Sequence, residues 1–171
     1  VAAMLAMGRH TLAEPPGSSE TSQSDDRSVT YLAAGKPFAT YVHQDEQITR
    51  PYFKDLRSIA GDVPLSRHFP PRKGIDLDDH ALFHPGLWLA FGDISGEDFW
   101  RLKAGVSHAE FAAKPKSQTR GTTSNAYRED VSTVVNRFET AAGKPLLRER
   151  CRFGMSRLKS GWLLTWDSTF E

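Results

Sequence analysis

The segment of residues 78–100, "DDHALFHPGLWLAFGDISGEDFW", gathers groups capable of chemistry that the rest of the chain spreads thinly. It contains His80 and His84, whose imidazoles can exchange protons near neutral pH or bind a metal ion. Carboxylates stand on both sides of them, Asp79 before and Asp93 after. Polar groups that converge beside aromatic rings are typical of a site for a small molecule. The sequence therefore places the candidate site in this segment.

The four-residue spacing of His80 and His84 raises a metal site as an alternative. On a helix this spacing puts both imidazoles on one face, as in zinc enzymes, but Pro85 and Gly86 follow at once and disfavour a helix. In an extended chain the two side chains stand about 13 Å apart, too far to share an ion. Only a curled loop would bring them together. We predict no metal site. The other alternative is that Asp78, Asp79 and His80 cap the lead-in to a strand while His84 is hydrogen-bonded at the rim of the sheet.

Five residues outside this histidine pair are candidates for substrate binding. Arg50 and Tyr52, then Arg67 and His68, lie on the predicted strands that precede the segment and could hydrogen-bond to hydroxyl or carboxylate groups. Trp100 follows a turn and offers an aromatic face that could stack on a sugar ring. The alternative is a solvated surface position for the polar side chains and packing against a sheet for Trp100.

Composition limits the classes of partner. The 171 residues include 22 Lys and Arg against 21 Asp and Glu. No overall field therefore attracts nucleic acid or an anionic membrane, and we expect neither partner.

Cys151 is the only cysteine, which excludes an internal disulfide and a thiolate zinc cluster and favours a structural role. No apolar run approaches the roughly 18–20 residues of a membrane helix. We expect a soluble protein, with cytoplasm and periplasm both open and no cofactor assigned.

Strand patterns recur along the chain, while helical periodicity is weak apart from a turn or so at residues 97–104. We predict strands at residues 29–35, 37–44, 50–58, 63–69, 86–93, 104–113, 130–139, 146–155 and 161–170. The polar residues 114–125 indicate a long loop. These elements predict an all-β protein, an antiparallel β-sandwich.

Two of the predicted strands differ in character. "GLWLAFGD" is apolar on both faces, which is typical of a central strand buried on two sides with Trp88 in the core. "LLRERCRFGM" alternates basic residues with others, and Glu149 interrupts the basic run. This pattern indicates a solvated strand face.

The chain divides into an N-terminal part without a core and one folded domain. Residues 1–28 look like a leader followed by a disordered linker, because residues 14–28 have almost no apolar side chains. Residues 29–171 form the β-sandwich domain. The last predicted strand runs to Glu171 without a terminating turn, so we expect an incomplete domain whose missing strands lie beyond it.

Three sequence pieces resemble a known family: "RPYF", the segment from "DDHALFHPGLW", and "GDISGEDFW". They are similar to the bacterial proteins of unknown function named "methane oxygenase PmoA", over about residues 41–171. The resemblance implies a β-sandwich of the galactose mutarotase-like supersandwich type, of which this chain would be an N-terminal fragment. It also implies a link to carbohydrates, because members are often encoded near sugar oxidoreductases.

A mutarotase-like activity would use a histidine as general acid and a carboxylate as general base on a sugar ring. By this resemblance His80 and His84 are the candidate catalytic histidines, with Asp79 or Asp93 orienting them. Carbohydrate binding or proton transfer is the leading hypothesis. The alternatives are a non-catalytic module that partners a sugar oxidoreductase, and a metal-dependent oxygenase as the family name suggests; the sequence leaves open whether the chain is an enzyme.

Overall fold

The computed structural model describes residues 22–33, 35–58, 60, 63–122, 126–158 and 161–171. Its strands are β1 (Ser22–Ser24), β2 (Ser28–Ala33), β3 (Lys36–Val42), β4 (Tyr52–Lys54), β5 (Gly105–Arg120), β6 (Tyr127–Glu139), β7 (Pro145–Arg157) and β8 (Trp162–Phe170). These residues contain no helix, and therefore none long and apolar enough to cross a membrane.

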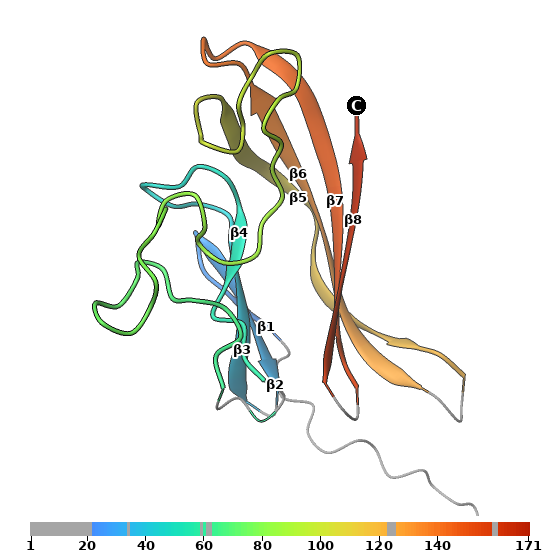
Figure 1. Ribbon diagram of the computed structural model, residues 1–171. Helices are drawn as coiled ribbons and strands as arrows, with labels where there is room; N and C mark the ends of the chain where they lie inside the picture. Colours follow the sequence, from blue (N-terminus) through green and yellow to red (C-terminus); the bar gives the residue numbers. More distant parts are fainter. Residues whose placement is uncertain (1–21, 34, 59, 61–62, 123–125, 159–160) are drawn as a thin grey trace, which may run out of the picture.

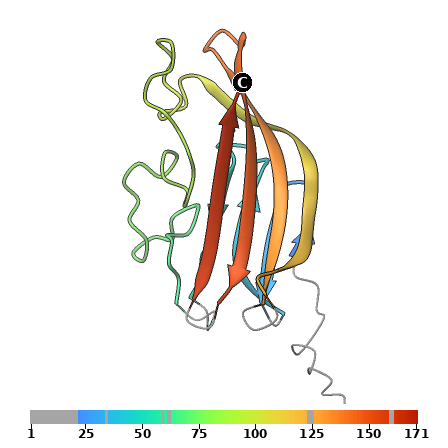
Figure 2. The same cartoon turned by 90° about the vertical axis from the view of Figure 1, so that its right-hand side faces the viewer.

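The strands form two antiparallel sheets, each following the order of the chain. One sheet has the order β1-β2-β3-β4 and the other β5-β6-β7-β8. The two sheets face each other (Figure 1), and Figure 2 shows the second sheet in front of the first. The predicted all-β antiparallel sandwich is confirmed.

Side-chain alternation explains why the sheets pack on each other. In β7, Cys151 and Phe153 point inward while Arg150 is exposed and Arg152 half-exposed, as expected where only one face of a sheet is buried. The main core draws apolar side chains from both sheets, and rings make up much of it: Tyr31, Phe38, Tyr41, Phe53 and Phe153. This shared core holds the two sheets together.

The segment "GLWLAFGD" is not the central strand that its apolar residues predict. Its only ladder contact in the described chain is an isolated bridge between Leu87 and Phe53, and Leu87 is 40% exposed. Trp88 packs on a small cluster around Tyr52, whereas Phe91 packs on another around Phe99. The apolar residues of this segment therefore pack into two separate small cores, because its irregular backbone directs them to different places.

This segment belongs to the long connection between β4 and β5, residues 55–104, whose described residues form no strand or helix. Figure 2 shows it along the side of the sandwich on which β8 lies. The hairpin predicted for residues 50–58 and 63–69 is reduced to the short β4 and a bridge between Arg57 and Pro64. All predicted site residues except Arg50 and Tyr52 lie in this connection.

The polar loop predicted at residues 114–125 is largely strand. β5 continues to Arg120 and pairs with β6 as far as Tyr127, with three register shifts along the way. β5 has a partner on one side only, and an edge strand tolerates the polar and charged residues that suggested a loop. Residues 123–125 lie outside the described residues.

The described fold begins earlier than the predicted linker boundary. Ser22–Ser24, inside that predicted linker, forms β1 and pairs with β2. The pairing uses backbone groups, so it needs none of the apolar side chains whose scarcity indicated disorder. Residues 1–21 lie outside the described residues.

Candidate functional site

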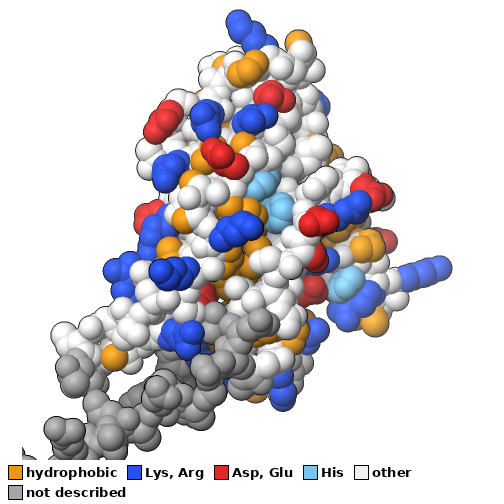
Figure 3. All heavy atoms as spheres, turned by 180° about the vertical axis from the view of Figure 1, so that it is seen from behind, with side chains coloured by type: hydrophobic (Ala, Val, Ile, Leu, Met, Phe, Trp, Pro, Cys, Tyr) orange, Lys and Arg blue, Asp and Glu red, His pale blue; other side chains and the backbone are white. Residues whose placement is uncertain are grey.

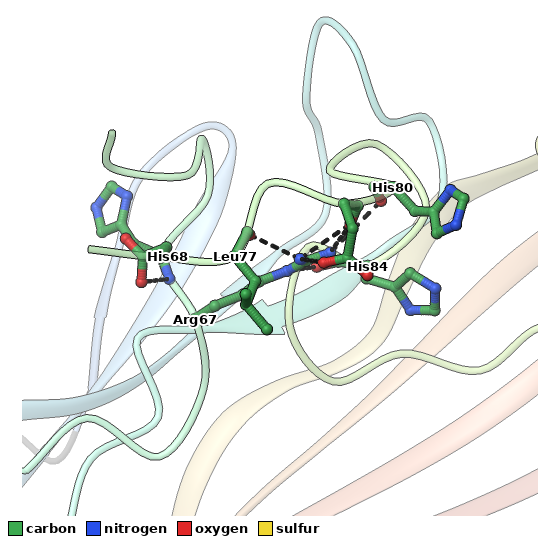
Figure 4. Close-up of polar contacts among 7 residues, drawn as sticks. Arg67, His68, Leu77, His80 and His84 are labelled. Carbon is green, nitrogen blue, oxygen red and sulfur yellow. Dashed lines mark hydrogen bonds and ion pairs between the residues drawn. The ribbon is translucent and has the colours of Figure 1, made fainter. Parts of the chain in front are cut away.

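Arg67 is the scaffold of the loop that carries the two predicted catalytic histidines. Its guanidinium donates hydrogen bonds to the carbonyl oxygens of His84 at 2.8 Å, Leu77 at 2.8 Å and Asp79 at 3.0 Å, and Figure 4 shows these contacts converging on it. Asp79 also accepts a hydrogen bond from it through Oδ1, at 3.1 Å. Arg67 and Asp79 thus shape the loop, and their charges are already paired.

His80 and His84 are brought together by a tight turn. The His84 amide donates to the His80 carbonyl oxygen at 3.1 Å, and His80 adopts a positive φ of 53°. The two ring centroids lie 6.2 Å apart, and Figure 4 shows both imidazoles on the same side of the loop. The loop curls, so the distance expected for an extended chain does not apply.

Aromatic rings surround His84. Its ring centroid lies 5.7 Å from that of Trp88 and 5.9 Å from that of Trp100. We call His80, His84, Trp88 and Trp100 the histidine–tryptophan cluster. Within the described residues, no group hydrogen-bonds to the imidazole nitrogens of His80 or His84. His80 is exposed and His84 is half-buried.

Arg50 is buried, at 1% exposure, and packs against Trp88 of this cluster. Its guanidinium carbon lies 3.7 Å from the centre of the Trp88 ring. It donates hydrogen bonds to the carbonyl oxygens of Phe99 (3.1 Å), Trp100 (3.0 Å) and Phe83 (3.1 Å). Burial lowers the pKa of Arg50 to about 10, so the guanidinium keeps its charge at neutral pH. Arg50 holds the loops in place.

The other predicted site residues are engaged elsewhere. The Tyr52 hydroxyl is buried and donates to Asp45 at 3.0 Å, and burial is the main cause of its raised pKa. His68 lies apart from His80 and His84 in Figure 4, with its Nδ1 2.8 Å from the Pro70 carbonyl oxygen. Asp93 accepts the Gly96 amide hydrogen at 2.7 Å in an exposed turn. The structure thus brings together His80, His84 and Trp100 from the predicted set.

A metal centre has no complete ligand set in the described part of the chain. No group of three or more histidine, cysteine, aspartate or glutamate side chains is placed to hold an ion there. The iron site of the oxygenase hypothesis needs two histidines and a carboxylate. Among the described residues, no third side chain completes such a ligand set with His80 and His84.

A second polar cluster, missed by sequence reasoning, lies between the sheets. His108, Asn136 and Glu149 occupy one row across β5, β6 and β7, in register with one another. Asn136 donates to Glu149 at 2.8 Å, and Ser168 also donates to Glu149. We call His108, Asn136 and Glu149 the interior polar row.

Arg148 and Arg150 form the predicted solvated strand face, whereas Glu149 lies on the opposite, buried face. Its side chain is buried at 2% exposure while Arg148 and Arg150 point outward. The alternation in "RERCRF" places Glu149 on the same face as Cys151 and Phe153, so the signal was present in the sequence. Burial of Cys151 raises the pKa of its thiol to about 12, and the nearby Glu149 charge acts in the same direction. This fits the expected structural role of Cys151.

The interior polar row reaches the surface at a histidine pair. His108 lies 4.8 Å from His43 and 4.7 Å from Phe111 between ring centroids. Burial lowers the pKa of His108 to about 4, His43 lowers it further, and the Asn136 side chain opposes this. Figure 3 shows two adjacent histidine side chains beside hydrophobic ones near the middle of the back face.

Comparison with known proteins gives a family and no activity. No curated protein and no solved structure matches the chain. The model of one protein family, described as a family of unknown function (DUF6807), matches residues 28–171. This match covers every strand of both sheets except β1. The chain therefore belongs to DUF6807, a family of unknown function.

Proposed function

We propose that this protein binds a carbohydrate at the histidine–tryptophan cluster. The observation that carries the proposal is the pair of unengaged imidazoles beside two tryptophan rings. Arg67, Asp79 and Asp93 of the same connection hydrogen-bond to the loop backbone or to each other. Within the described residues, His80 and His84 have no hydrogen bond at either ring nitrogen, whereas the Nδ1 of His68 lies 2.8 Å from the Pro70 carbonyl oxygen.

The chemistry of the cluster suits a sugar. A neutral imidazole has one donor and one acceptor nitrogen, which matches a hydroxyl group. The Trp100 ring is partly exposed, and the Arg101 guanidinium carbon lies over it, 4.7 Å from the ring centre. The C–H side of a pyranose would stack on the ring face that Arg101 does not cover. The resemblance to PmoA-like proteins, with their neighbouring sugar oxidoreductases, supports the same ligand class.

Proton transfer on the sugar is the finer form of this proposal. His80 or His84 would be the general acid, as in the mutarotase-like reaction. Asp79 is paired with Arg67 and Asp93 caps a turn, so either would have to leave its partner to act as base. The geometry of the cluster therefore supports sugar binding more strongly than it supports catalysis.

Saturation-transfer NMR against a panel of sugars and keto-sugars tests the proposal. We expect transfer to the ring protons of at least one sugar, and at least about tenfold weaker binding in His84→Ala, the loss of roughly one hydrogen-bonded partner. His68→Ala is the matched control, because its imidazole lies on the same connection but outside the cluster. Absence of binding by every sugar, or binding that His84→Ala leaves unchanged, contradicts the proposal.

A second candidate function is a non-catalytic module that docks on an oxidoreductase. It is favoured by exposed aliphatic side chains on the same connection: Val63, Leu65, Ile75, Leu77, Leu82 and Leu87. Ile75 and Leu77 are 74% and 76% exposed, and neighbouring exposed apolar groups are typical of interaction sites. Co-purification with an oxidoreductase encoded beside this protein, abolished by Leu77→Asp, would support docking over sugar binding.

A further inference from the structure

A small cavity lies between the two sheets, next to the interior polar row. Its volume is about 10 Å³, which is room for one water molecule. Apolar side chains form part of its wall, including Val106, Phe153 and Trp166. The polar residues that line it are Tyr41, Arg50, Asn136 and Glu149. They come from both sheets: Tyr41 from β3, Arg50 from the residues before β4, Asn136 from β6 and Glu149 from β7.

Three of the residues that line the cavity each have a buried polar atom without a hydrogen-bond partner among the described residues. These atoms are the hydroxyl of Tyr41, Nε of Arg50 and Oδ1 of Asn136. Each belongs to a side chain no more than 3% exposed, and a polar atom buried without a partner is strongly unfavourable. The set is complementary, because Arg50 Nε can only donate, Asn136 Oδ1 can only accept and the hydroxyl can do either.

Two opposite charges also face this cavity without a direct ion pair between them. The Arg50 guanidinium binds three backbone carbonyl oxygens and no carboxylate in the described structure. Glu149 accepts from Asn136 and Ser168 and pairs with no described lysine or arginine. Burial raises the pKa of Tyr41, and Cys151 and the nearby Glu149 carboxylate raise it further. Tyr41, Arg50 and Glu149 all line this one cavity.

We infer that one water molecule is bound in this cavity and bridges the two sheets. It accepts hydrogen bonds from Arg50 Nε and the Tyr41 hydroxyl, and it donates to Asn136 Oδ1 and the Glu149 carboxylate. All four hydrogen-bonding positions of the water are then used, and the three orphaned atoms are satisfied. Arg50 is thereby fixed on both sides, by the loop carbonyls outside and by the water inside.

A crystal structure of the unaltered protein at about 1.8 Å resolution or better tests this water directly. We expect an ordered solvent peak within about 3.2 Å of Arg50 Nε and of Asn136 Oδ1 or the Glu149 carboxylate. Direct hydrogen bonds among these side chains, or a cavity without an ordered peak, would overturn the inference. This test needs no variant and no sugar, so it is independent of the proposed function.

A double-mutant cycle between Tyr41→Phe and Glu149→Gln tests the bridge in solution. If both residues hold the same water, the effects of the two changes on the unfolding equilibrium constant are coupled by about fivefold. Tyr31→Phe is the matched control, because Tyr31 is a buried tyrosine of the same core whose hydroxyl pairs directly with Ser132 at 3.2 Å. Its effect should add to that of Glu149→Gln without coupling. Additive effects of Tyr41→Phe and Glu149→Gln would contradict the bridge.

Discussion

At the scale of single residues, burial decides which polar groups build the fold and which face a ligand. Arg50 and Arg67 both appeared as substrate contacts in the sequence, because an arginine near a polar loop suits hydroxyl or carboxylate groups. In the structure each donates several hydrogen bonds to backbone carbonyl oxygens. His80 and His84 keep free nitrogens in the described structure. The residue types were readable from the sequence, but their hydrogen-bond partners were not.

Replacing Arg50 with lysine tests its supporting role. We expect Arg50→Lys to lower the free energy of unfolding by about 3 kcal/mol, because one ammonium group cannot serve three separated carbonyl oxygens or stack on Trp88. Urea denaturation followed by fluorescence measures this change. Arg101→Lys is the control, since Arg101 also lies over a tryptophan but is exposed. It should change stability by less than about 0.5 kcal/mol, and an equal loss in both variants would contradict the role of Arg50.

At the scale of elements, the candidate loop depends on a close approach to β4. Leu87 exchanges two backbone hydrogen bonds with Phe53, at 2.8 Å and 2.9 Å. Gly86, just before it, has a φ of +150°, and a Cβ there would lie 2.1 Å from the Phe53 carbonyl oxygen. Only glycine fits this approach. The prediction of a strand at residues 86–93 came from apolar content, which does not reveal such a contact.

Gly86→Ala should therefore disrupt the base of the candidate site. We expect the free energy of unfolding to fall by about 2–3 kcal/mol, because the clash is with backbone that cannot turn away as a side chain can. Chemical denaturation measures it. Gly92→Ala, in the same connection, is the control, because its added Cβ meets nothing within 4 Å. If both alanine variants are equally stable, the result would contradict the close packing of Gly86 against the Phe53 backbone.

At the scale of the whole molecule, polar groups as well as apolar ones join the two sheets. Tyr31 of β2 pairs with Ser132 of β6. His43, which directly follows β3, contacts His108 of β5. Burial lowers the pKa of both histidines, so the neutral forms are the ones that fit the interface. The sandwich should weaken when these imidazoles take up protons.

The pH dependence of stability follows from His108. Its pKa is about 4 in the folded protein against 6.5 for the unperturbed side chain, so the unfolded state binds the proton more readily. The contribution of neutral His108 to the free energy of unfolding is complete above pH 6.5 and is lost as the pH falls from 6.5 towards 4. We expect the thermal midpoint to fall over this range, and to fall less in His108→Gln. Parallel curves for the two proteins would contradict the assignment.

The sequence by itself determined the all-β class and most strands of the sandwich, because alternation of apolar and polar residues is a local property of a strand. It also indicated the segment in which His80, His84 and Trp100 come together. Only the tertiary structure decided that β5 runs on to Arg120 and that Arg50 and Arg67 are internal supports. Each of these depends on a partner far away in the chain, and no local pattern records which distant group fills that place.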